Sequence, residues 1–106
     1  MCRPNSVIST EAAQAFIARR PFRRGNTEVV ASRCRALLLL YGTVIGENSE
    51  ARGVRLTMAG WGTMTTAARL NAVMRALGRD ACWRHKDGVW HYGDRVLDNL
   101  DEEVEV

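Results

Sequence analysis

The chain has 106 residues, of which 46% are hydrophobic and 25% are charged, and its formal net charge is +3. This length and composition are typical of one small globular domain and exclude a chain with two cores. The longest apolar run, residues 36–41, is far below the roughly 20 residues that span a bilayer, and no signal-peptide pattern opens the sequence. We therefore expect a cytoplasmic protein with no membrane segment. Its three widely spaced cysteines favour reduced thiols over a disulfide framework.

Acidic and basic residues are unevenly distributed along the chain. Five of the twelve acidic residues follow residue 97, which leaves 15 basic and 7 acidic residues, a net charge of +8, over residues 1–97. We expect residues 1–97 to form one domain and residues 98–106 to be a disordered acidic tail. A basic body can attract a polyanion or an acidic protein. The abundance of arginine can equally reflect the codon bias of a genome.

The first predicted element is a helix over residues 10–20. Ser9 is a suitable N-cap, Glu11 lies where the helix dipole favours an anion, and Pro21 ends the helix. A polar turn at residues 23–26 is expected to follow.

Strand signals begin at residue 27. Residues 27–31 are β-prone, residues 32–34 can form a turn, and residues 36–41 are apolar on both faces, as expected of a central strand. Leucine also favours helices, but the brevity of the run and Gly42 directly after it favour a strand.

The chain is then expected to return and form another strand. A two-residue turn with Gly42 as its first residue leads back through residues 44–45. A polar loop is predicted at residues 47–53. Alternating apolar residues at 54–59 predict a half-buried strand.

Residues 60–78 have the pattern of a helix marked at both ends. Thr65 or Thr66 is the predicted N-cap, and Gly78 can take the left-handed conformation that stops a helix. Apolar residues spaced i, i+3, i+4 and i+7 form one stripe: Leu70, Val73, Met74 and Leu77. We expect this stripe to cover the strands.

The clearest local signal is a hairpin around Asp87-Gly88, the favoured pair for a type I′ turn. It predicts four cross-strand pairs: Lys86 with Val89, His85 with Trp90, Arg84 with His91, and Trp83 with Tyr92. One face then carries Trp83, His85, Trp90 and Tyr92. This aromatic face could stack bases of a single strand, but we favour a core role, with His85 partly buried, because a small domain needs large side chains inside.

These elements predict an α+β protein in which a small antiparallel sheet, a strand meander plus a C-terminal hairpin, packs with two helices in the order α-β-β-β-β-α-β-β.

Nucleic-acid binding is the first functional hypothesis. Its candidate phosphate contacts are six arginines in one stretch and four residues of the second helix: Arg19, Arg20, Arg23, Arg24, Arg33, Arg35, Thr65, Thr66, Arg69 and Arg75. Gly60-x-Gly62-x-x-Thr65 weakly matches a phosphate-binding turn, so Thr65, Thr66 and Arg69 could hold one phosphate or simply serve the helix start.

Metal and catalytic patterns are weak. Cys82, His85, His91 and Cys34 are residue types that bind zinc, but Cys82 and His85 are three apart on a strand and point to opposite faces. The two histidines lie on opposite faces of the hairpin with no acid placed beside either. We expect neither a metal nor another cofactor, and we do not expect an enzyme.

Several segments together resemble a family of small proteins encoded by tailed phages and prophages. They are Gly25-Asn26-Thr27-x-Val29, the leucine run ending in Tyr41-Gly42, Gly60-Trp61-x-Thr63-x-Thr65-Thr66-x-x-Arg69-Leu70-Asn71, and Trp90-x-Tyr92. The chain departs from the pattern after Tyr41-Gly42, where a polar residue is expected, and in its acidic extension. The resemblance implies a phage origin and expression in a bacterial cytoplasm, and it implies no activity.

Two functional hypotheses follow. One is a binding module for DNA or RNA, whose helix, strands, helix order is similar, at the level of fold alone, to the double-stranded-RNA-binding layout. The alternative is a phage accessory protein that binds and inhibits a host protein complex, a hypothesis favoured by the small size and by arginine and tryptophan residues suited to interfaces. A homodimer formed through an edge strand or the Trp61 region is compatible with both.

Overall fold

The structure, a computed structural model, describes residues 7–106. Its elements are α1 (Val7–Ala18), β1 (Phe22–Arg24), β2 (Thr27–Ala31), β3 (Arg35–Leu40), β4 (Thr43–Ser49), β5 (Gly53–Leu56), α2 (Met64–Ala76), β6 (Trp83–Lys86), β7 (Val89–Tyr92), β8 (Arg95–Val96) and β9 (Val104–Glu105). The predicted α+β class, with two helices and antiparallel strands, is confirmed.

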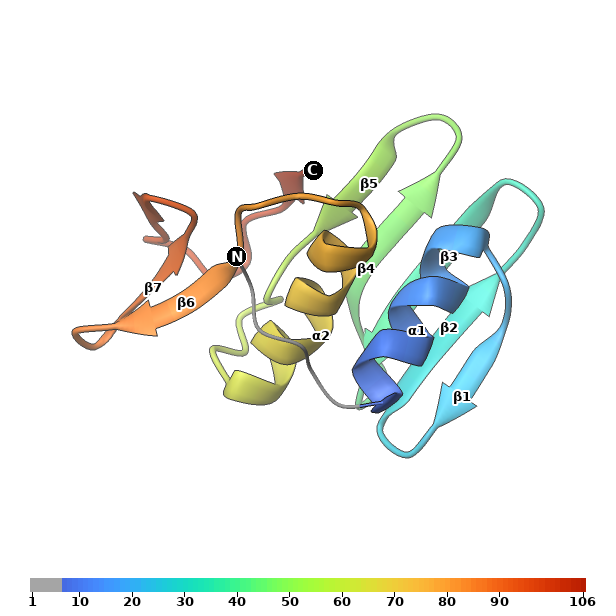
Figure 1. The fold of residues 1–106 in the computed structure, drawn as a ribbon, viewed down its shortest axis with the longest axis horizontal. Coiled ribbons are helices and arrows are strands. Elements are labelled where there is room, and N and C mark those ends of the chain that lie inside the picture. Colours follow the sequence, from blue (N-terminus) through green and yellow to red (C-terminus); the bar gives the residue numbers. More distant parts are fainter. Residues whose placement is uncertain (1–6) are drawn as a thin grey trace.

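Both helices lie side by side on one face of a six-stranded antiparallel sheet (Figure 1). The strand order is β1-β2-β3-β4-β5-β9. Helix α1 covers β1 to β3, and α2 packs over β4. The largest side chains buried between helices and sheet include Phe16, Leu38, Ile45, Leu56 and Leu70. Their burial supplies the main hydrophobic stabilisation of the domain.

Helix α1 begins at Val7, before its predicted start, so Ser9 lies inside the helix and is buried instead of capping it. Alanines and Phe16 form its inner face, which lets the helix approach the sheet closely. At its C-terminal end, Asn48 of β4 donates hydrogen bonds to the carbonyls of Phe16 (3.0 Å) and Ile17 (3.2 Å). These bonds satisfy carbonyls that the end of a helix leaves unpaired.

The polar turn expected at residues 23–26 is shorter than predicted. Residues 22–24 form the edge strand β1, and Arg24 pairs with Thr27 across a two-residue turn. Gly25, with φ +58°, permits this tight reversal. Arginines are tolerated in β1 because an edge strand leaves side chains in solvent.

The leucine run is a strand, as predicted, but the turn after it was predicted one residue out of place. Tyr41 (φ +51°) and Gly42 (φ +80°) are its two central residues, because Leu40 pairs with Thr43. The following strand, β4, extends to Ser49 through part of the predicted loop 47–53. Polar residues occupy this strand because Asn48 caps α1 and Glu47 pairs with arginines.

The second helix starts earlier than its predicted cap. Thr63, with φ −115° and ψ 156°, is the N-cap, and its Oγ1 accepts a hydrogen bond from Thr66 N–H at 3.1 Å. Thr65 and Thr66 therefore lie in the first turn of α2. The predicted apolar stripe is confirmed, with Leu70, Val73 and Met74 buried and Leu77 partly buried.

The C-terminal hairpin has the predicted register in all four pairs. It gains a third strand, β8, and packs beside α2 as a second sheet (Figure 1). Trp83 and Trp90 are buried, which confirms their core role. The expectation that His85 is partly buried is wrong. Its ring lies beside the Trp90 ring, but the side chain is exposed because His85 is near the tip of the hairpin.

Part of the acidic segment expected to be disordered is a strand of the main sheet. Val104–Glu105 forms β9, which pairs with β5, and Val104 is buried. Arg55 holds Glu105 at 2.9 Å, and Arg52 holds Glu103 at 3.2 Å. Two acidic residues of this segment thus meet arginines of the main sheet, which makes its ordering favourable.

Candidate binding groove at the start of the second helix

The ten predicted phosphate contacts do not form one surface. Arg19, Arg20, Arg33 and Arg35 flank the end of the sheet where α1 finishes, whereas Thr65, Thr66 and Arg69 belong to the first two turns of α2 at the opposite end. On β2, Thr27 lies at the end where α2 begins and Ala31 lies at the end where α1 finishes. The two residues are about 13 Å apart along the strand. Arg75 lies in the last turn of α2.

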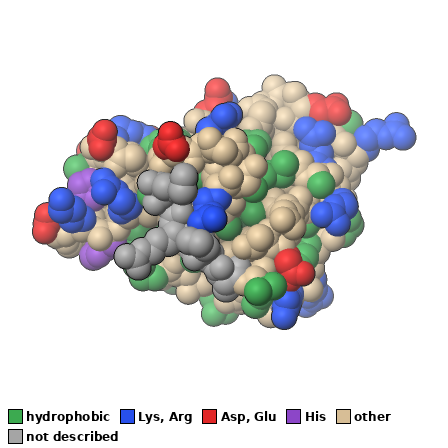
Figure 2. All heavy atoms as spheres, viewed as in Figure 1, with side chains coloured by type: hydrophobic (Ala, Val, Ile, Leu, Met, Phe, Trp, Pro, Cys, Tyr) green, Lys and Arg blue, Asp and Glu red, His purple; other side chains and the backbone are tan. Residues whose placement is uncertain are grey.

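Three of the six clustered arginines are held by carboxylates. Measured from guanidinium nitrogen to carboxylate oxygen, Arg24 lies 2.6 Å from Glu11 and Arg35 lies 2.9 Å from Glu47. Arg19 lies 3.7 Å from Glu50. On the helix side of the molecule, acidic side chains lie among the basic ones and no continuous basic field forms (Figure 2). The basic surface is therefore weaker than the sequence predicts.

Three exposed arginines remain, Arg20, Arg23 and Arg33. Within residues 7–106, none of them has a carboxylate within ion-pair distance. Arg20 precedes β1, Arg23 lies within β1, and Arg33 lies in the β2–β3 turn, so all three are near the edge of the sheet farthest from the hairpin.

Arg69 is buried and has an internal role in place of the predicted phosphate contact. Its guanidinium donates to Ser9 Oγ at 2.6 Å, to Thr27 Oγ1 at 2.8 Å and to Asn26 Oδ1 at 3.1 Å. Burial lowers the pKa of Arg69, and the nearby phenol of Tyr41 partly offsets this effect. The Arg69 side chain, from α2, thereby binds Ser9 of α1, Asn26 of the β1–β2 turn and Thr27 of β2, and so joins these elements.

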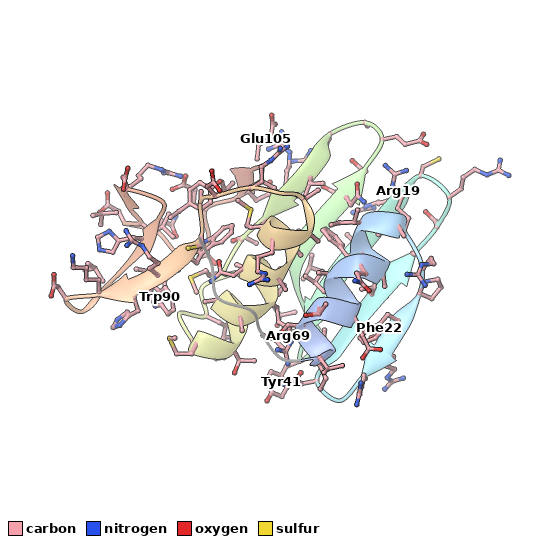
Figure 3. All side chains as sticks on the ribbon, in the orientation of Figure 1. Arg19, Phe22, Tyr41, Arg69, Trp90 and Glu105 are labelled. Atoms are coloured by element: carbon pink, nitrogen blue, oxygen red, sulfur yellow. The ribbon has the colours of Figure 1, made fainter. Side chains whose placement is uncertain are left out.

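A groove of about 380 Å³ opens at the same end of the molecule, between the β3–β4 turn, the 59–63 loop and the first turn of α2. Figure 3 shows Tyr41, on its rim, at the end of the molecule where Arg69 lies. The lining residues are Leu40, Tyr41, Thr43, Ile45, Trp61, Thr63 and Thr66. The lining is thus mainly apolar, from two aliphatic and two aromatic side chains, with three threonine hydroxyl groups among them.

Two aromatic side chains stand exposed at this groove. Tyr41 is 77% exposed and Trp61 is 61% exposed, and Met64, which follows closely in the sequence, is 71% exposed. Large apolar side chains left in water beside a concave apolar surface are typical of a binding site.

The backbone keeps both aromatic residues on turns. Tyr41 has φ +51°, and the loop before Trp61 contains Ala59 with φ +52° and Gly60 with φ +79°. Non-glycine residues with positive φ are uncommon and often lie at functional sites. The sequence analysis did not predict this groove. An aromatic residue next to a turn glycine, as Tyr41 is to Gly42 and Trp61 is to Gly60, indicates a side chain that stays at the surface.

The sequence segments that resemble phage proteins meet inside the structure. Asn26 and Thr27 from one segment accept hydrogen bonds from Arg69 of another. In the same long segment, Thr63 caps α2 and Asn71 binds the backbone of Trp83. These residues therefore hold the elements together, which accounts for their arrangement without a ligand.

A protein-family model, described as Kyanoviridae Gp96 protein, matches residues 5–103. The chain belongs to this family. The prediction of a small phage-protein family is thus confirmed. The match includes both helices and every strand except β9. No curated protein and no solved structure matches this family member.

A helix able to span a membrane and a cluster of metal-binding side chains are both absent from residues 7–106. No helix in that range combines the length and the apolar character that a bilayer crossing requires. The same range contains no group of three or more His, Cys, Asp or Glu side chains arranged to hold a metal ion.

Proposed function

We propose that this phage-family protein is a non-enzymatic binding protein of the infected bacterial cytoplasm, and that its groove binds an apolar segment of a host protein. The observation that carries the proposal is the pair of exposed aromatic side chains, Tyr41 and Trp61, at the apolar groove. Tryptophan and tyrosine are over-represented among the residues that dominate the affinity of protein interfaces.

The shape of the groove agrees with this role. Its volume of about 380 Å³ lies in the lower part of the range of binding cavities, enough for a short apolar segment. Leu40 and Ile45 offer apolar contacts, while Thr43 and Thr63 offer hydroxyl groups that could orient a bound backbone. Binding such a segment would allow the protein to inhibit a host complex.

The test is capture of partners from a nuclease-treated bacterial lysate, followed by affinity measurement with the purified partner. We expect Trp61→Ala to weaken binding by about 30-fold, as for a typical interface hot spot. Val89→Ala, which trims another exposed apolar residue that does not line the groove, is the control and should bind like wild type. Equal binding by all three proteins would refute the role of the groove.

Nucleic-acid binding stays the second candidate, favoured by the exposed Arg20, Arg23 and Arg33, which form no ion pair within residues 7–106. Three phosphate contacts predict a slope of about −2.7 for log affinity against log salt on duplex DNA. The experiment is a salt titration with labelled DNA and RNA. Replacing the three arginines with glutamine should abolish binding, whereas the same loss of charge on the hairpin, at Arg84, Lys86 and Arg95, should not. No binding at low ionic strength would eliminate this candidate.

A further inference from the structure

The main sheet has a second face, which the helices do not cover. Strand alternation places Val30, Leu37, Leu39 and Val44 on this face, and the register sets Val30 opposite Leu37 and Leu39 opposite Val44. The four side chains therefore form one contiguous aliphatic block on β2, β3 and β4. Val30 is 49% exposed and Val44 is 42% exposed, and the two leucines are partly exposed. None of the four belongs to the buried core.

Such a block is unusual on a solvent-facing sheet. The open face of an antiparallel sheet normally carries polar side chains, and strands that are apolar on both faces normally have both faces covered. Strand β3 is apolar on both faces, yet both helices pack on only one of them (Figure 1). The composition of β3 thus indicates a second covering layer.

Charged residues of both signs flank the block. On the β1–β2 side, Arg23 and Glu28 are opposite each other in the register, yet neither forms an ion pair within residues 7–106. On the other side, Leu37 is opposite Glu47, and the same cross-strand row continues through Arg55 and Glu105. A surface for a polyanion would carry one sign, whereas a surface with both signs on its two flanks can complement itself.

We propose that a second copy of this chain covers the open face and forms a two-fold symmetric dimer by sheet-on-sheet packing. A two-fold axis parallel to the strands and between β3 and β4 stacks β3 of each copy on β4 of the other, with Leu39 over Val44. The same axis places the β1–β2 flank of one copy against the β5–β9 flank of the other. Glu28 then faces the flank that carries Arg55, and Arg23 faces the flank that carries Glu105.

The available area allows a weak dimer. Strands β1 to β5 have 3, 5, 6, 7 and 4 residues, so at about 3.3 Å per residue and about 4.8 Å between strands they present a face of roughly 400 Å² per copy. The total, roughly 800 Å², is in the range of weak, transient interfaces. We therefore expect a dimer that dissociates on dilution.

The dimer surface is separate from the groove, whose lining includes Leu40 and Thr43, on the helix side of the same strands. The two proposals can therefore fail independently. Trp61→Ala should weaken partner binding without changing the mass of the protein.

The experiment is sedimentation of the full chain over a dilution series. Wild type should reach twice the monomer mass of 11.8 kDa at high concentration. The double variant Val30→Glu with Val44→Glu should raise the dissociation constant by roughly 100-fold, because carboxylates would be buried in an apolar contact. Val89→Glu is the matched control, since Val89 is also a strand valine that is 42% exposed, and it should dimerise like wild type.

Two further variants make the result decisive. Val44→Thr keeps the shape of the side chain, so it preserves folding and should still weaken the dimer by a few fold. Glu28→Arg should weaken it at low salt and much less at high salt, because charge repulsion is screened. A wild-type monomer at every concentration, or a dimer that survives the double variant in folded form, would overturn the proposal.

Discussion

Asn71 of α2 binds the backbone of Trp83 through both ends of its side-chain amide. Its Oδ1 accepts a hydrogen bond from Trp83 N–H at 2.8 Å, and its Nδ2 donates one to the Trp83 carbonyl at 3.0 Å. Trp83 is the first residue of β6, so this one amide fixes where the hairpin begins relative to the helix. The second sheet is therefore attached by polar contacts as well as by its buried tryptophans.

Asn71→Ala should destabilise the protein by about 2–3 kcal/mol, because it leaves two partly buried backbone groups of Trp83 without partners. Urea unfolding followed by tryptophan fluorescence measures this loss. Asn99→Ala, at an exposed asparagine with one hydrogen bond to Asp101 N–H, is the control and should cost less than about 1 kcal/mol. Equal losses in the two variants would contradict a special role for Asn71.

Arg69→Met should destabilise the domain by about 2–4 kcal/mol, because three buried or partly buried oxygen atoms lose their shared donor. Arg69→Lys should restore only part of this loss, since an ammonium group cannot reproduce the spacing of three guanidinium donors. Arg33→Met, at an exposed arginine, should change the free energy of unfolding by no more than about 0.5 kcal/mol. Thermal and chemical denaturation both report these differences. Unchanged stability in Arg69→Met would contradict the internal role of Arg69.

Gly62→Ala should cost about 1–3 kcal/mol through overpacking. An added Cβ would lie 2.6 Å from Trp90 Nε1 and 2.8 Å from Leu100 Cδ1, so the Trp90 ring must move. Gly53→Ala separates steric crowding from backbone strain: its Cβ would meet no atom, but its φ of +74° costs about 1–2 kcal/mol. Only Gly62→Ala should also change the tryptophan emission of the native state.

Burial raises the pKa of Tyr92, with Arg95 and Arg79 opposing the shift. A raised pKa means that the folded state favours the neutral phenol, so this stability is fully present below the unfolded pKa of about 10 and is lost as the pH rises through the folded value. Between about pH 8 and pH 11, wild type should therefore lose more unfolding free energy than Tyr92→Phe. Parallel pH dependence in the two proteins would count against burial of the phenol.

We expect slow amide exchange at the C-terminal strand, within residues 98–106, which the sequence predicts to be disordered. Val106 N–H donates to the Val54 carbonyl at 3.0 Å, so its exchange should be slowed. Changing Arg52 and Arg55 together to glutamine should speed this exchange, because both hold acids of the segment. Fast exchange of Val106 in wild type would restore the prediction of a disordered tail.

Local features of this fold were predictable from contiguous residues. Asp87-Gly88 determines the register of the hairpin because few residue pairs accept two successive positive φ angles. The four-leucine strand and the apolar stripe of α2 follow from side-chain periodicity, which depends only on neighbouring positions. The cap of α2 was misplaced because three threonines, Thr63, Thr65 and Thr66, offer the same hydroxyl within four residues.

What only the tertiary structure decided are the contacts between distant segments. Arg69 reads as a surface cation in the sequence, but its acceptors Thr27 and Ser9 lie 42 and 60 positions away, and burying a guanidinium is favourable only where such acceptors converge. The exposed groove at Tyr41 and Trp61 likewise depends on two turns brought together by the sheet and α2. Periodicity and turn chemistry act within a few residues, whereas the burial of a charge or the exposure of an aromatic ring depends on which remote parts of the chain pack against it.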